Sequence, residues 1–143
     1  MTATLRTWER LQHAAELADV LDAAYDAFEE MLQVIRAHED PASELFAALL
    51  MAAASAADGR DAVAFAPSFP PYGGSVAPAV HDGLQAGESA ETIAHAVAAV
   101  SRLLVARLTQ AWESSTHPDD RAACADALRC AENICDLMGG GGT

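Results

Sequence analysis

Residues 65–74 read FAPSFPPYGG, within a segment (residues 59–87) that holds every glycine outside the C-terminal tail and four of the six prolines. Proline fixes φ and lacks a backbone donor, so it excludes a helix interior and a central strand here. On both sides the sequence has the periodicity of alanine-rich amphipathic helices, with no strand-like alternation. The 59–87 segment therefore divides the chain into two helical halves.

The N-terminal half predicts two helices. From about residue 4 to residue 38 the apolar side chains follow a heptad without glycine or proline, which predicts one helix of about 50 Å. The heptad positions are Leu11, Ala14, Ala18, Leu21, Tyr25, Phe28, Leu32 and Ile35. Asp40 and Pro41 are typical of a helix start and Gly59 of a helix stop, so a second helix is expected over residues 41–58.

The C-terminal half predicts two further helices. One covers residues 89–114, and the other covers residues 118–138, with Thr116 or His117 as its N-cap. Short connections make the helices of each half antiparallel neighbours. We therefore expect an all-α domain over residues 1–138, a four-helix bundle of two antiparallel helical hairpins joined by the 59–87 crossover, followed by a flexible glycine-rich tail at 139–143.

The charged residues of the chain exclude several classes of partner and enzyme. The chain has a net charge of −13, and its eight basic residues contain no lysine. Such a surface repels phosphate backbones and anionic lipid, so neither nucleic acid nor membrane is an expected partner. The missing lysine excludes Schiff-base enzymes and Walker A nucleotide sites. The longest apolar stretch, Leu45–Ala57, is too short to span a bilayer, and no signal peptide is visible, which predicts a cytoplasmic protein.

No catalytic, metal or cofactor motif stands out. Two groups have helical spacing, Glu9 with His13 and Glu16, and Glu91 with His95, but both fall on the polar side of their helices. The three cysteines, Cys124, Cys130 and Cys135, lack the spacing of zinc sites or redox pairs, and only the reactivity of Cys130 stays open. We expect no cofactor, no bound metal and, on balance, no enzyme.

The unequal helix lengths predict a homodimer. A helix over 41–58 covers only about 27 Å of its longer partner, so the N-terminal half of the first helix needs another cover. Either the 59–87 segment or a second copy of the chain can supply it. The candidate dimer interface consists of Trp8, Leu11, Leu21 and Tyr25.

The aromatic side chains of the crossover have three interpretations. They fill space beyond the short second helix, they close a cavity for a small hydrophobic or aromatic ligand, or they form a polyproline-like surface for a partner. The candidate ligand-binding residues are Phe65, Phe69, Tyr72, Arg60, His81, Phe46, Leu104 and Trp112. The first of these interpretations requires no ligand.

Three functions follow in order of preference. The sequence favours a small acidic binding or assembly protein that is homodimeric and acts by protein–protein interaction. The alternative is a binding protein for a small apolar ligand under the 59–87 segment. The third is a helical enzyme with a dispersed site.

Overall fold

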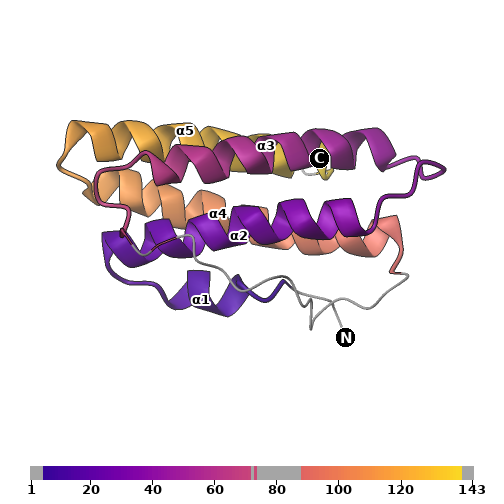
Figure 1. The fold of residues 1–143 in the computed structure, drawn as a ribbon, viewed down its shortest axis with the longest axis horizontal. Helices are drawn as coiled ribbons and strands as arrows, with labels where there is room; N and C mark the ends of the chain where they lie inside the picture. The colour runs from indigo at the N-terminus through magenta and orange to yellow at the C-terminus, as the bar shows by residue number, and fades with distance from the viewer. Residues whose placement is uncertain (1–4, 72, 74–87, 140–143) are drawn as a thin grey trace.

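The computed structural model describes residues 5–71, 73 and 88–139. The described chain forms five helices and no strand: α1 (Trp8–His13), α2 (Leu17–Ala37), α3 (Phe46–Ala64), α4 (Ala90–Ser114) and α5 (Pro118–Leu137). Figure 1 shows α3 and α5 side by side along one side of the molecule, with α2 and α4 below them. The pairs α2 with α3, α3 with α5, α4 with α5 and α2 with α4 all pack together, and α1 packs against α2 and α4. The all-α prediction is confirmed.

The single helix predicted over residues 4–38 is wrong. Its backbone breaks between α1 and α2, where Ala14 (ψ 130°) and Glu16 (ψ 152°) are extended. The break lets α1 fold back beside the start of α2 (Figure 1). The heptad did not predict the break because Leu11 and Ala14 stay in phase with the apolar positions of α2.

Carboxylates of α2 hold the folded-back segment in place. The buried Glu30 carboxylate accepts hydrogen bonds from the backbone amides of Arg6 (2.8 Å) and Thr7 (2.9 Å) and from the Thr7 hydroxyl (2.9 Å). Arg10 forms ion pairs with Asp22 and Asp26. Because an orphaned amide at a helix start needs an acceptor, Glu30 supplies the cap that the N-terminus of α1 lacks in its own sequence.

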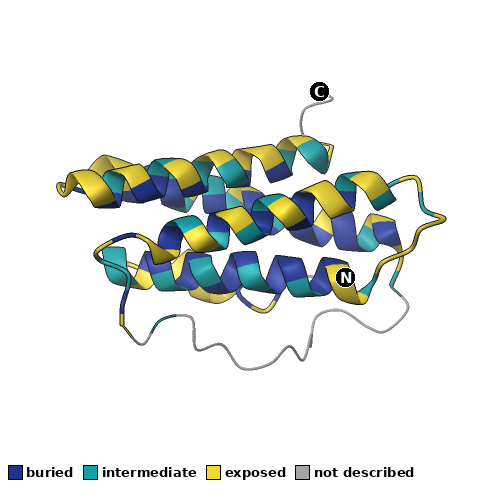
Figure 2. Ribbon diagram, turned by 45° about the horizontal axis from the view of Figure 1, so that its top comes forward, coloured by how far each residue is buried: buried dark blue, intermediate teal, exposed yellow. Residues whose placement is uncertain are grey.

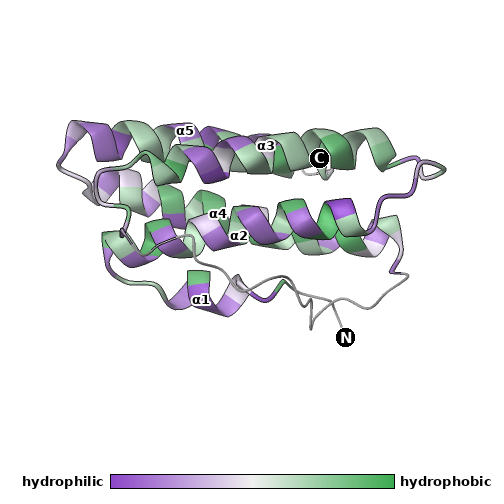
Figure 3. Cartoon of the chain, in the orientation of Figure 1, coloured by the Kyte–Doolittle hydropathy of each residue, from purple (hydrophilic) through white to green (hydrophobic). Residues whose placement is uncertain are grey.

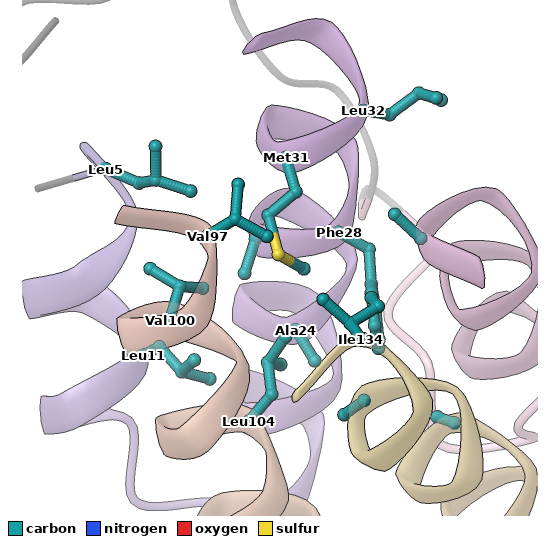
Figure 4. Close-up of a cluster of buried hydrophobic side chains, with 14 of the residues drawn as sticks. Leu5, Leu11, Ala24, Phe28, Met31, Leu32, Val97, Val100, Leu104 and Ile134 are labelled. Atoms are coloured by element: carbon teal, nitrogen blue, oxygen red, sulfur yellow. The ribbon is translucent and has the colours of Figure 1, made fainter. Parts of the chain in front are cut away.

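The same fold-back completes the hydrophobic core. Leu5 and Leu11, from the N-terminal segment, are buried, and Figure 4 shows them beside Val97 and Val100 of α4. The core continues through Phe28 and other side chains of α2 to α5. The chain therefore covers part of α2 and α4 with its own first helix.

The predicted helix over residues 41–58 is displaced at both ends. Asp40 starts a turn instead of a helix: its carboxylate accepts a hydrogen bond from the Ala42 amide (3.1 Å), and α3 begins only at Phe46. At the other end, Gly59 does not stop the helix, which continues to Ala64. Gly59 is buried against Phe28, where a Cβ atom would lie 2.5 Å from the ring, so this glycine is required for close packing of α2 on α3.

The C-terminal helices begin at side-chain caps. Ser89 Oγ accepts a hydrogen bond from the Thr92 amide (3.2 Å) at the start of α4, and His117 Nδ1 accepts one from the Asp119 amide (3.1 Å) at the start of α5. Gly139 follows α5 with φ of 103°, the left-handed geometry that ends many helices.

Of the described helices, α4 alone is long and apolar enough to cross a membrane by length and composition. Half of its apolar stretch is buried inside the fold, as for the central helix of a helical domain. From the sequence, Leu45–Ala57 was the expected longest apolar stretch, so α4 was not predicted to meet this criterion. The cytoplasmic location stays a prediction.

Candidate functional site

The predicted ligand-binding residues that the structure describes are spread over the molecule. Phe46 and Phe65 lie at opposite ends of α3, about 28 Å apart by helix rise. Leu104 is fully buried in the core, whereas Trp112 is partly exposed and carries the Arg121 guanidinium 4.6 Å above its ring. Tyr72 and His81 lie outside the described residues.

The first part of the crossover fills space and is anchored to α5. Phe69 packs against Tyr25 of α2, with ring centroids 5.4 Å apart. Ser68 donates two hydrogen bonds to the buried Asp120 carboxylate, from its amide (2.9 Å) and from its hydroxyl (2.6 Å). Ala66, two residues before Ser68, is also buried. In the described residues, Phe69 therefore has the space-filling role that the sequence offered as one of three interpretations.

Arg60 holds two helices together and is not directed toward a ligand cavity. Its guanidinium donates to Glu29 of α2 (2.8 Å) and to the neighbouring Asp61 (3.1 Å). Burial alone raises the pKa of Glu29, but hydrogen bonds from Arg60 and Gln33 outweigh it, and the pKa is lowered overall. The hydrogen bond to Glu29 likewise raises the pKa of Arg60.

This pair makes stability depend on pH. Because the folded-state pKa of Glu29 lies below its ordinary value of 4.5, its stabilising effect is complete above that value and is lost as the pH falls through the lowered pKa. The free energy of unfolding should fall as the pH is lowered from roughly 5 to 3, and we expect it to fall less steeply in Arg60→Gln than in wild type. Urea titrations across this range test the expectation, with Arg129→Gln, which removes only an exposed pair, as control. Equal slopes in wild type and Arg60→Gln would contradict it.

The predicted dimer interface is partly used by the chain itself. Leu11 and Leu21 are fully buried, so neither side chain is available to a second copy. Trp8 and Tyr25 remain partly buried and pack at the edge of the core. The heptad includes Leu11, Leu21 and Tyr25, and Trp8 flanks it, but the pattern did not show that α1 would cover α2 within the same chain.

The outer side of α3 carries most of the exposed large hydrophobic residues of the described chain. Large hydrophobic side chains are exposed at four described positions, and three of them belong to α3 or follow it directly: Leu50 (40% exposed), Met51 (57%) and Phe65 (85%). Ala47 and Ala54 are exposed beside Met51. Figures 2 and 3 show that the outer side of α3 combines exposure with hydrophobic residues, above all in its N-terminal half. We call Ala47, Leu50, Met51 and Ala54 the α3 face.

Two open grooves lie beside α5. The larger, about 600 Å³, runs between α4 and α5 and is lined mainly by charged and polar side chains, including Arg102, Arg129 and Asp136. The smaller, about 310 Å³, lies between the C-terminal end of α3 and the N-terminal half of α5. Its lining is mostly apolar, with carboxylates at its edge: Ala62, Phe65, Pro67, Asp119, Ala122, Ala123 and Asp126.

The candidate catalytic and metal-binding groups are dispersed over the surface. Glu9, His13, Glu16, Glu91 and His95 are all exposed. Among the described residues, no three His, Cys, Asp or Glu side chains come close enough to hold a metal ion. Burial raises the pKa of all three cysteine thiols, Cys130 included, so each is a weaker nucleophile at neutral pH than a free thiol.

The α3 face was not predicted from the sequence, although Leu45–Ala57 is the longest apolar stretch. A helix that is apolar on all sides gives no period from which to tell its buried side from its exposed side. Its one available signal was an excess of apolar residues over what one buried side requires.

No protein-family model, curated protein or solved structure matches this chain.

Proposed function

We propose that this protein acts by binding another protein, and that the α3 face is the centre of its binding surface. The observation that carries the proposal is the exposure of Leu50 and Met51 side by side on a helix whose other side already packs on α2 and α5. Contiguous exposed apolar side chains are typical of interaction sites, whereas isolated ones need no explanation.

The shape of the surface fits a helical or extended segment of a partner. Ala47 and Ala54 flank Met51 with small side chains, so a partner backbone can approach α3 closely while Met51 adapts to its contours. At 19 residues, α3 presents about 28 Å of length. A stable interface of about 800 Å² on each partner needs more than this one helix, and α5 lies directly beside it.

In this proposal the scaffold is a four-helix bundle of two hairpins, formed by α2 with α3 and α4 with α5. Its function is to keep the outer side of α3 rigid and exposed. The homodimer predicted from the sequence stays a prediction, and the mass in solution measured by sedimentation velocity tests it. Because Leu11 and Leu21 are buried, such a dimer needs a surface other than the predicted one.

Site-specific photo-crosslinking tests the proposed surface. A photoreactive phenylalanine analogue replaces Met51 in the host cell, and the same analogue at the exposed His95 of α4 is the matched control. We expect one adduct of defined mass from position 51 and none of that mass from position 95, and we expect Leu50→Glu to abolish it. Adducts of equal yield at both positions, or adducts indifferent to Leu50→Glu, would refute the α3 face as a binding surface.

A further inference from the structure

The smaller groove beside the α3 face has features that point to the chemistry of the partner. Phe65 lines this groove and is 85% exposed. The backbone that carries it is held in place, because Ser68, three residues later, is hydrogen-bonded to Asp120 of α5. An aromatic ring in this position presents a negative π-face beside an apolar floor. The floor is formed by small side chains, Ala62, Ala122 and Ala123.

Negative charge surrounds this apolar floor. Asp119, Ala122 and Asp126 are spaced three and four residues apart, so they share one side of α5 and place a carboxylate at each end of the groove. The negative end of the α3 dipole and the positive end of the α5 dipole both lie at this groove and offset each other, so its negative charge comes from the carboxylates. Asp126 pairs with Arg129 (3.0 Å), but both side chains are exposed, and an exposed pair contributes little.

The groove and the α3 face form one continuous strip. Met51, Ala54, Asp58, Asp61 and Phe65 recur at intervals of three or four residues, so they lie along one side of α3 over about 21 Å. The strip is therefore apolar at Met51, acidic at Asp58 and Asp61, and aromatic at Phe65. Arg60 is the one basic residue of α3 near these exposed carboxylates. It pairs with Asp61 and also with Glu29 of α2.

A second copy of the chain fits this strip poorly. An antiparallel pair of α3 helices centred on Met51 sets Asp58 past the start of the other copy's α3, toward the turn that contains Glu44. A parallel pair sets Asp58 opposite itself. Both arrangements bring like charges together between chains that each carry −13. Charge complementarity instead requires a partner that brings cations to the strip.

We propose that the groove between α3 and α5 receives an arginine side chain from an amphipathic segment of another protein, whose apolar residues cover the α3 face. The guanidinium stacks on Phe65 and pairs with the carboxylate of Asp119, while its methylene stem lies on the alanine floor. Asp126, about 10 Å further along α5 by helix rise, adds negative charge at the other end of the groove. This inference rests on the proposed function, because it names the chemistry of the partner at the same surface.

A titration with a small probe tests the groove directly. N-acetyl-arginine amide is added to the ¹⁵N-labelled protein, and N-acetyl-citrulline amide, which has nearly the same shape without the charge, is the control ligand. The arginine compound should cause saturable changes in the amide chemical shifts of Ala62, Ala122 and Ala123 and their neighbours. The citrulline compound should bind at least about fivefold more weakly. Phe65→Ala and the double variant Asp119→Asn/Asp126→Asn should each weaken arginine binding, because each removes a part of the proposed site. All three side chains are exposed, so we expect both variants to fold.

The matched control is Glu132→Gln/Asp136→Asn, which removes the same charge from the other end of α5. It should leave the affinity of the groove for the arginine compound unchanged. Equal affinity for arginine and citrulline, or equal weakening by the control variant, would overturn the inference, because both indicate diffuse attraction to an acidic surface. A dimer in solution that dissociates on Asp119→Asn/Asp126→Asn would also overturn it, since the occupant would then be a second copy.

The two proposals fail in distinguishable ways. A specific crosslink at position 51 without an arginine preference in the groove refutes the inference and leaves the α3 face as a binding surface. An arginine preference without any crosslink refutes the protein partner and leaves a groove that selects small organic cations.

Discussion

Replacing Gly59 with alanine is expected to destabilise the protein by about 1–3 kcal/mol, although alanine is the better helix former by about 1 kcal/mol. The added Cβ would lie 2.5, 2.6 and 2.9 Å from three atoms of the Phe28 ring. Phe28 is fully buried, so its ring has no solvent-filled space into which to move. Either α3 moves away from α2 or the ring leaves its rotamer, and both responses loosen the core.

Urea unfolding followed by circular dichroism measures this change. Asp58→Ala, at the exposed neighbouring position, is the control and should alter the free energy of unfolding by no more than about 0.5 kcal/mol. The double variant Phe28→Leu/Gly59→Ala should be less destabilised than the sum of its single variants, because the smaller side chain makes room for the methyl group. An alanine variant as stable as wild type would show that the α2–α3 contact is looser than described.

Replacing Glu30 with alanine is expected to cost about 2–4 kcal/mol and to release α1 from the rest of the fold. The substitution leaves the Thr7 amide and hydroxyl and the Arg6 amide without the carboxylate that accepts their hydrogen bonds. Unsatisfied buried donors are costly, so the segment should separate from α2 and expose Leu5 and Leu11.

Hydrogen exchange of the α1 amides reports this release separately from global stability. Amides of residues 11–14, which bond within α1, should lose protection in Glu30→Ala, while those in the middle of α5 keep most of theirs. Glu9→Ala, in the exposed first turn of α1, serves as the control. Unchanged protection of α1 in the Glu30 variant would contradict the capping role assigned to this carboxylate.

How much the sequence predicts is clearest at particular residues. The helical class and the course of the C-terminal half followed from periodicity and caps, because Ser89 and His117 act locally. The break before α2 and the burial of Gly59 did not follow, because each depends on a contact distant in sequence. Glu30 meets Thr7 across 23 residues, and Phe28 meets Gly59 across a helix pair, so neither interaction leaves a local pattern.

The candidate site was predictable only in part for the same reason. Phe65 and Phe69 cannot be told apart by the sequence around them. In the structure, Phe65 is exposed at a groove, whereas Phe69 packs on Tyr25. Their different roles come from Ser68, which Asp120 fixes to the start of α5 52 residues later in the chain. The composition of the crossover drew attention to Phe65 and Phe69, whereas the exposed apolar surface extends along α3.

The most direct test of the binding function is the affinity of the protein recovered by crosslinking at position 51. Isothermal titration calorimetry compares wild type with Leu50→Glu/Met51→Glu, and with Glu91→Ala/His95→Ala on the exposed side of α4 as control. Because charged side chains in the centre of an apolar interface cost several kcal/mol, we predict binding at least about a hundredfold weaker for the α3 variant and unchanged for the control. Equal affinity of the wild type and the α3 variant, with both folded, would contradict the account.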